Sequence, residues 1–194
     1  MEKVSYALGL SLGNNLMGSG VTTLAYSQLA KGIEDMMEGK SADMTMQEAQ
    51  TIISEFFESL QAKMSEKSIE EGKAFLDQNS KRSEVITLES GLQYEILVSG
   101  NGALPKATDT VEVHYHGSLI DGKVFDSSVQ RGEPATFGVT QVIPGWVEAL
   151  QLMPVGSKWR LVIPSELAYG SQGAGQSIAP YSTLVFEVEL LSIV

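Results

Sequence analysis

Hydrophobic side chains recur every three to four residues along the first forty residues of the chain, which is the spacing of an amphipathic helix. A first apolar stripe consists of Val4, Leu8, Leu12 and Leu16, and a second of Tyr26, Leu29, Ala30, Ile33, Met36 and Met37. Gly39 follows the second stripe, and glycine is the usual residue in the left-handed conformation that ends a helix. The pattern therefore predicts two short helices at the start of the chain.

A third helix is expected to be much longer than the first two. Thr45 and Glu48 have the spacing of a capping box, in which each side chain accepts a hydrogen bond from the other residue's backbone N–H. The apolar face that follows consists of Ala49, Ile52, Ile53, Phe56, Phe57, Leu60 and Met64. No stop signal interrupts the helix from Met46 to about Asn79, a length of roughly 50 Å. Its later surface is polar, which predicts a solvent-exposed stalk with Gly72 as a weak point.

The helical segment is expected to self-associate. Two short helices and the start of a long one form too small a core to be stable alone. A dimer that shares the methionine- and phenylalanine-rich face solves this problem. The interface residues that we expect are Leu8, Leu12, Leu16, Tyr26, Ile33, Met36, Met37, Ile53, Phe56 and Phe57. The alternatives are an intramolecular three-helix bundle and docking of this face on the rest of the chain.

From Leu88 onward the hydrophobic period changes to two, which is typical of half-buried strands. The side chains expected on the buried face are Leu92, Tyr94 and Ile96 in the first strand, Val111, Val113 and Tyr115 in the second, and Leu184, Phe186, Val188 and Leu190 in the third. Only one helix is expected here, from Pro144 to about Leu152, between turn signals rich in glycine. The sequence thus predicts an α+β fold, with a mostly antiparallel sheet wrapped on one short helix.

Composition places the domain boundary near residue 84. All six prolines lie between Pro105 and Pro180, and seven of the eight methionines lie at or before Met64. We therefore expect a helical dimerisation domain with its long linking helix in residues 1–83 and a second domain in residues 84–194.

Charge and composition exclude several function classes. With 13 Lys and Arg against 24 Asp and Glu, the net charge is -11, which disfavours nucleic acid as a partner. The chain has no cysteine, so disulfides and thiolate metal sites are excluded. No apolar run approaches the ~20 residues of a membrane span, and the first residues lack a continuous signal-peptide core. We expect a cytoplasmic protein without a membrane partner, or a periplasmic one only if a signal peptide has been removed.

The residues offer little conventional chemistry. His114 and His116 flank Tyr115 on a strand and, together with Glu112, point away from its apolar face. A Glu-x-His-x-His strand could bind zinc, but no fourth ligand is indicated, which favours an outward polar face of the sheet. The glycine-rich stretch GSQGAGQ lacks the lysine and the following helix of a phosphate-binding loop. We therefore expect no metal and no cofactor.

What remains is an excess of apolar and aromatic side chains at strand ends, loops and the start of the short helix. Trp146 follows a Pro-Gly turn at that start, where an indole can form the floor of a cleft between helix and sheet. The set consists of Tyr115, Phe125, Phe137, Val142, Ile143, Trp146, Tyr169, Ile178 and Phe186.

The segments VEVHYHGSLIDGKVFDSS, VIPGWVEALQLMPVGSKWRLVIPSELAYG and STLVFEVELL resemble the FKBP-type peptidyl-prolyl cis-trans isomerases across residues 88–194. The stretch that begins YALGLSLGNNL resembles the dimerisation segment of the bacterial macrophage-infectivity-potentiator-like members without a signal peptide. This resemblance implies a sheet of five to six antiparallel strands curled around one helix, joined by a stalk helix to an interlocked dimer module. It also adds Asp126 to the nine residues above as a pocket position, and places Trp146 under a bound proline ring.

The resemblance implies an isomerase whose partners are proline-containing polypeptides, unfolded clients, macrolide inhibitors and a second copy of the chain. An aromatic pocket would speed rotation about an X-Pro bond by removing water, without an acid, a base or a nucleophile. In this scheme the Ile143 N–H and the Tyr169 hydroxyl hold substrate carbonyls. Asp126 either contacts substrate or only orders Tyr115 and Arg131.

Two departures from the family pattern, Ala135 and Ala174, leave the affinity for macrolides and the preference for the residue before proline open. The rival hypothesis is a dimeric folding chaperone, or holdase, with weak or incidental isomerase activity.

Overall fold

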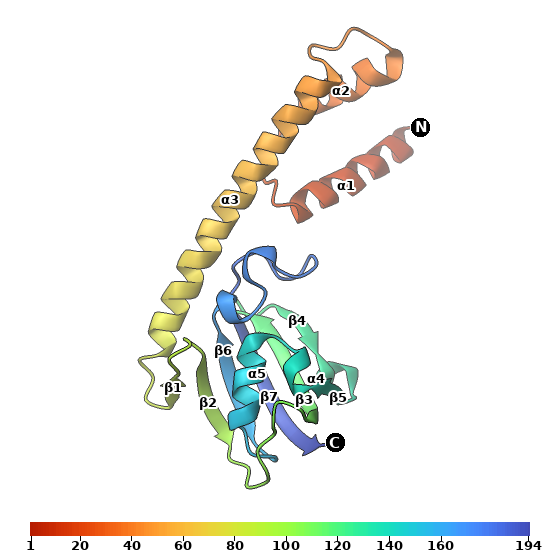
Figure 1. The fold of residues 1–194 in the computed structure, drawn as a ribbon. Helices are drawn as coiled ribbons and strands as arrows, with labels where there is room; N and C mark the ends of the chain where they lie inside the picture. Colours follow the sequence, from red (N-terminus) through yellow and green to blue (C-terminus); the bar gives the residue numbers. More distant parts are fainter. The chain divides into compact units, whose positions relative to one another are not determined.

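A computed structural model describes all 194 residues, which form two compact units, Met1–Met64 and Ser65–Val194. The first unit is helical, and Figure 1 labels its elements. They are α1 (Glu2–Gly18), α2 (Tyr26–Glu38) and the first part of α3 (Met46–Asn79). The three helices expected from the apolar stripes are confirmed.

The predicted helix ends are also present. Gly39 ends α2 in the left-handed conformation, with φ of 64°. At the start of α3, the N–H of Glu48 donates to Thr45 Oγ1 at 3.2 Å, and the N–H of Thr45 donates to Glu48 Oε2 at 2.8 Å. Local sequence therefore determines where these helices begin and end.

The helical unit buries almost none of its large apolar side chains. Val21 and Asp35 are its only buried residues. Leu8 is 67% exposed and Met37 is 83% exposed, although both belong to the apolar stripes. As a single chain, residues 1–64 thus lack a core of their own.

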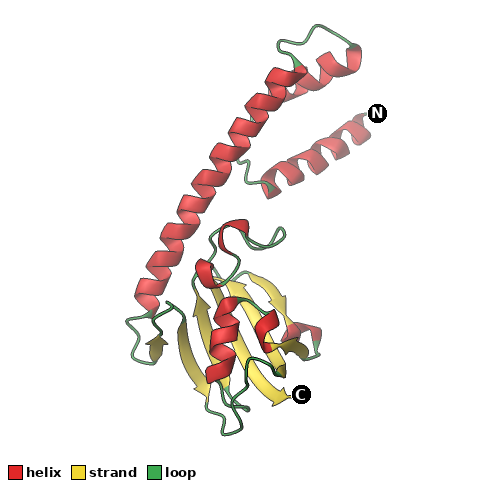
Figure 2. Cartoon of the chain, in the orientation of Figure 1, coloured by secondary structure: helices red, strands yellow, loops and turns green.

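The second unit is built on one antiparallel sheet, which Figure 2 shows with α5 (Pro144–Leu152) lying across one face. The strands are β1 (Val85–Thr87), β2 (Gln93–Val98), β3 (Thr110–Leu119), β4 (Val124–Ser127), β5 (Ala135–Gly138), β6 (Lys158–Ile163) and β7 (Leu184–Ile193). Their order is β1-β2-β6-β7-β3-β4, and β5 also pairs with β3. The sheet has seven strands rather than five or six because the short β1 and β5 extend it.

The core lies between this sheet and α5. Leu150 of α5 packs there with Val113 of β3 and Leu161 of β6, and each of these side chains is at most 1% exposed. The predicted alternation holds in β3 and β7, which lie next to each other inside the sheet. It is wrong at Ile96, which is 46% exposed, because the last three residues of β2 lie outside the core, where the pairing with β6 shifts register between Ile96 and Val98.

The second unit contains more helical turns than the sequence indicated. A single turn, α4 (Ser128–Arg131), follows β4, and the Ser127 hydroxyl caps it by accepting from Gln130 N–H at 3.2 Å. Three short 3-10 turns occupy Val139–Gln141, Ser165–Leu167 and Gly170–Gln172. Segments this short carry no hydrophobic period, so the pattern could not predict them.

The second half of α3 belongs to the second unit and is not a free stalk. Asn79 Nδ2 donates to Gln93 Oε1 at 2.8 Å, and Gln93 Nε2 donates to the Leu76 carbonyl at 3.0 Å. Gly72 is buried, and a methyl group there would collide with Thr183. The glycine therefore permits a close approach and is not merely a weak point. The division between the compact units falls within α3, upstream of the expected boundary at residues 83 and 84.

No helix combines the length and the apolar composition that crossing a membrane requires.

Candidate functional site

A cavity of about 440 Å³ opens in the second unit, where α5, the sheet and the adjoining loops meet. Its wall is largely aromatic. The lining residues are Tyr115, Phe125, Asp126, Phe137, Gln141, Val142, Ile143, Trp146, Tyr169 and Phe186.

Trp146 lies in the first turn of α5 and is 4% exposed. The chain reaches this position through Ile143, which caps the helix, and Pro144, whose fixed φ suits the first helical position. The Trp146 N–H donates to the Ile143 carbonyl at 2.9 Å. The helix start therefore fixes the indole against the core and leaves the cavity open beside it.

Three aromatic rings hold the indole edge to face. The centroid distances from Trp146 are 5.5 Å to Tyr115, 5.9 Å to Phe137 and 5.3 Å to Phe186, with interplanar angles of 82°, 88° and 81°. Such perpendicular contacts are the favoured arrangement of aromatic pairs because ring edges are positive and faces negative. The cavity wall is consequently preformed and apolar.

A glycine on β3 makes room for two of the wall residues. Gly117 pairs with Asp126 across the β3 and β4 strands. A methyl group on Gly117 would lie 2.7 Å from a ring carbon of Phe186 and 2.8 Å from ring carbons of Phe125. Those two rings meet edge to face at 5.4 Å. Only glycine lets both rings pack directly over the strand.

The polar edge of the cavity is a network of three side chains. Asp126 accepts hydrogen bonds from the Tyr115 hydroxyl and from Arg131. Arg131 also donates to the Tyr115 hydroxyl at 2.9 Å. The network ties the end of β4 to the neighbouring strand and to α4.

This network sets the charge states of its members. Burial alone would raise the pKa of Asp126, but the hydrogen bonds from Tyr115 and Arg131 outweigh it and hold the pKa below its usual value. Burial raises the pKa of Tyr115, and the hydrogen bond to Asp126 raises it further. At neutral pH the site therefore holds a carboxylate and a neutral phenol.

Two groups at the cavity can donate a hydrogen bond to a ligand. The Ile143 backbone N–H stands at the N-terminus of α5 and makes no bond to a turn or cap carbonyl. Tyr169 lines the cavity with a side chain that is 39% exposed. Both groups lie in the wall of the cavity, so a carbonyl oxygen bound there could accept a hydrogen bond from either.

The structure brings together nine of the ten expected pocket residues. Ile178 does not line the cavity: it is 6% exposed in the core, and its backbone pairs with Ala174. Gln141 lines the cavity although it was not expected. A single polar side chain in a 3-10 turn carries no periodic signal, so only the fold could reveal it.

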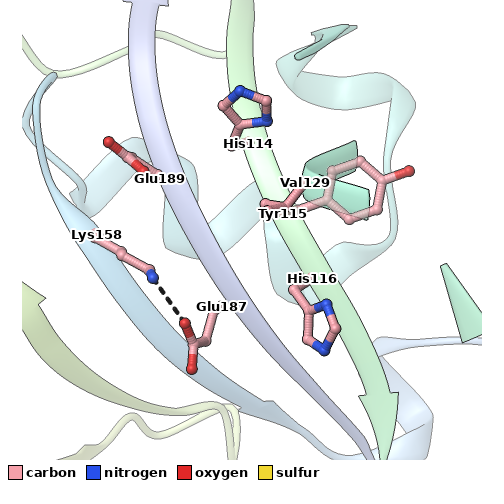
Figure 3. A pocket seen from close by; sticks show the side chains of 7 residues that line it. All are labelled: His114, Tyr115, His116, Val129, Lys158, Glu187 and Glu189. Carbon is pink, nitrogen blue, oxygen red and sulfur yellow. Dashed lines mark ion pairs between the residues drawn. The ribbon is translucent and has the colours of Figure 1, made fainter. Parts of the chain in front are cut away.

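The histidines lie on the opposite face of the sheet, as the alternation predicted. Figure 3 shows both imidazole rings along β3, and on the neighbouring β7 the pairing partners are Glu189 for His114 and Glu187 for His116. The two histidines line a second, smaller cavity of about 170 Å³. Lys158 also lines it and forms an ion pair with Glu187 at 2.8 Å.

One ring nitrogen of each histidine has a partner on the protein. His114 Nδ1 lies 3.1 Å from Ser128 Oγ, and His116 Nδ1 lies 3.0 Å from Ser127 Oγ. No three His, Asp or Glu side chains of the chain are grouped so that they could hold a metal ion.

Comparison with known proteins links both parts of the chain to one family. A family model described as FKBP-type peptidyl-prolyl cis-trans isomerase matches residues 102–191. A second, described as the domain amino terminal to FKBP-type peptidyl-prolyl isomerase, matches residues 1–96.

Similar proteins match over nearly the full length. The FKBP-type 22 kDa peptidyl-prolyl cis-trans isomerase of Escherichia coli is 51% identical over 194 residues, covering 98% of this chain and 94% of the relative. The outer membrane protein MIP of Legionella longbeachae is 44% identical over 199 residues, covering 99% of this chain and 85% of the relative. The crystal structure of FkpA from Escherichia coli aligns with a TM-score of 0.78 at 41% identity, covering 98% of this chain and 95% of that chain.

Proposed function

The chain belongs to the FKBP-type peptidyl-prolyl cis-trans isomerases, and we propose that the aromatic cavity around Trp146 is where it turns the X-Pro bond. It is an isomerase that acts on proline-containing polypeptides. The observation that carries the proposed site is the indole held edge to face by three rings beneath an open volume of about 440 Å³.

The mechanism follows from the electronic structure of the amide. Resonance gives the planar peptide bond double-bond character and separated charge, and the barrier to rotation is ~18–20 kcal/mol. Water solvates the planar, charge-separated form more strongly than the twisted form. A cavity walled by Trp146, Phe137 and Phe186 removes that water, so the planar ground state loses more stabilisation than the twisted transition state.

Two hydrogen bonds would hold one side of the bond while the other side turns. The Ile143 N–H and the Tyr169 hydroxyl are the candidate donors to substrate carbonyls. Fixing the substrate in this way confines its motion to the reacting torsion. Both donors lie at the edge of the apolar wall, where the flanking residues of a bound proline would pass.

Asp126 has a structural role that the geometry supports directly, because its carboxylate is occupied by Tyr115 and Arg131. These bonds orient the phenol that packs against Trp146. We therefore propose that Asp126 acts by ordering the wall rather than by transferring a proton.

The test is the isomerisation rate of a short X-Pro peptide with the full chain and with Trp146→Leu. We expect a loss of roughly 10- to 100-fold in kcat/KM, because leucine leaves part of the wall open to water. Circular dichroism of the variant controls for its fold. A folded Trp146→Leu variant with unchanged activity would move the reaction to another site.

We propose in addition that residues 1–64 form a homodimer through the exposed apolar stripes. Ile33, Met36, Ile53 and Phe56 are each between 46% and 61% exposed in the single chain. Soluble monomers rarely leave a contiguous apolar surface of this extent uncovered. A second copy with the same stripes would provide the missing core.

Binding of unfolded clients and of macrolide inhibitors stays a prediction, since it depends on the proposed cavity and on the proposed dimer. The holdase alternative has less support than the isomerase, because every aromatic residue expected in the pocket lines the cavity and only the aliphatic Ile178 does not. The cytoplasmic location is not supported by the similar proteins, one of which is named an outer membrane protein. Fractionation of cells that express the native gene would decide the location.

A further inference from the structure

The loop that carries Tyr169 lies between the isomerase cavity and helix α3. The chain leaves β6 at Pro164, passes Tyr169 at the cavity and enters β7 after Thr183. On the α3 side, a separate cavity of about 280 Å³ is lined by residues of both elements. Its lining residues are Ile69, Lys73, Leu76, Asp77, Pro164, Ser165, Glu166, Tyr181 and Thr183. A displacement of α3 would therefore act on the part of this loop that contains Tyr181 and Thr183.

A backbone hydrogen bond joins two segments of the loop. The Tyr181 N–H donates to the carbonyl of Gly170 at 2.8 Å, and Gly170 directly follows Tyr169. Tyr181 is the only residue other than glycine with a positive φ, at 59°. A residue with a side chain keeps this conformation only when its surroundings fix it. Here the hydrogen bond to the Gly170 carbonyl holds it, and Tyr181 lines the same cavity as Ile69, Lys73 and Leu76 of α3.

Helix α3 reaches the loop through a glycine. A methyl group on Gly72 would collide with Thr183 Oγ1 and lie 3.3 Å from Thr183 Cβ. Thr183 is 5% exposed, so it has little room to move away. Inside a helix, glycine is less favourable than alanine. Its presence here is explained by this close approach.

We propose that Gly72 and Thr183 are positioning residues of the isomerase. Their contact holds the loop so that Tyr169 presents its hydroxyl to a substrate carbonyl. The inference rests on the proposed function of Tyr169 and extends it, because it gives α3 a part in the reaction itself.

The experiment is a double-mutant cycle in the full chain, with kcat/KM on a short X-Pro peptide as the readout. Gly72→Ala is measured in the native background and in the Tyr169→Phe background. We expect a roughly tenfold loss in the native background, because a small misplacement of a substrate contact is costly. In the Tyr169→Phe background the same substitution should cost less than about twofold, since the affected hydroxyl is already absent.

Two further variants separate positioning from general damage. Glu70→Ala changes an exposed residue of α3 and should leave kcat/KM unchanged. Adding Thr183→Ala to Gly72→Ala removes the colliding oxygen and should recover most of the lost activity. Should Gly72→Ala fail to fold, Thr183→Ala alone takes its place in the cycle, with the loss again confined to the background that has Tyr169.

The outcomes distinguish this inference from the function on which it rests. Equal losses in both backgrounds, or no loss at all, would overturn the positioning role of Gly72 and Thr183. Full activity in Tyr169→Phe alone would remove the role of Tyr169, and the positioning role with it, while the isomerase assignment stands. No activity in the unaltered chain would overturn the proposed site as well.

Discussion

Gly117 lies under the ring of Phe186, so close that a methyl group on the glycine would come within 2.7 Å of a ring carbon. The same methyl group would lie 2.8 Å from ring carbons of Phe125. The strand β3 thus supports two walls of the cavity at the one position where it has no side chain.

Gly117→Ala is expected to push both rings toward the open volume and lower kcat/KM for an X-Pro peptide. Overpacking of this kind costs about 1–3 kcal/mol of stability, which urea unfolding measures. Ser118→Ala, at the neighbouring position of β3, is the control. Native activity in a folded Gly117→Ala variant would show that the cavity tolerates a displaced wall.

Removing an apolar wall should harm the reaction more than removing the carboxylate. Phe186→Leu opens the wall to water, whereas Asp126→Ala frees Tyr115 and Arg131 but leaves the rings in place. We expect the larger fall in kcat/KM from Phe186→Leu, as desolvation carries the rate. If Asp126→Ala lowers kcat/KM more than Phe186→Leu does, the rate depends mainly on the hydrogen-bond network of Asp126 and not on removal of water by the aromatic wall.

The Asp126 network should make the free energy of unfolding depend on pH in the acidic range. The folded protein holds the pKa of Asp126 below its usual value, so the carboxylate contributes stability above about pH 4 and loses it as the pH falls through the folded pKa. The unfolding free energy of the native chain should therefore approach that of Asp126→Asn as the pH drops below 4. A gap that stays constant from pH 7 to pH 3 would contradict this linkage. Glu133→Gln, an exposed site, is the matched control.

A fragment that begins at residue 84 should be less stable than one that begins at residue 65. The shorter fragment loses Leu76 and Asn79, the partners of the buried Gln93 side chain. Water replaces these partners in the shorter fragment, so each lost hydrogen bond is expected to cost about 0.5–1.5 kcal/mol. Urea unfolding of the two fragments measures the difference directly. Equal stabilities would mean that the second half of α3 contributes nothing to the isomerase unit.

The apolar stripes predict a dimer that a single charge can dissociate. The mass of the native chain in solution should be twice 20.9 kDa, and Ile53→Glu should bring it toward the monomer value. Light scattering gives both masses, with Gln61→Glu as a control at an exposed polar position of α3. Activity on a short peptide should persist, since the cavity lies wholly in the second unit. A native chain that is already monomeric would refute the interface.

The sequence predicted those parts of the molecule that local signals or a clear period define. The capping box at Thr45 and the αL glycine at Gly39 act within a few residues, so they could be located directly. The buried face of β3 could be predicted because its residues alternate regularly and α5 packs against that face.

The misses share a different cause, because each depends on a partner distant in sequence. Gly72 has an interior role only because Thr183 returns to the same place. Ile96 is exposed because it lies at the end of β2, where the pairing with the distant β6 shifts register. Gln141 joins the cavity wall through the path of the whole chain. Hydrophobic periodicity indicates which face of a single helix or strand is buried. These features instead depend on the positions of elements that are distant in sequence.

The lining of the cavity contains no serine, cysteine, lysine or histidine. An electrophilic compound would therefore find no strong nucleophile to label there. Inhibition has to come from occupancy, through a rigid, ring-shaped group that fills the volume beside Trp146. Such a compound acts reversibly and competes with substrate, so its potency in a cell declines as the concentration of proline-containing chains rises.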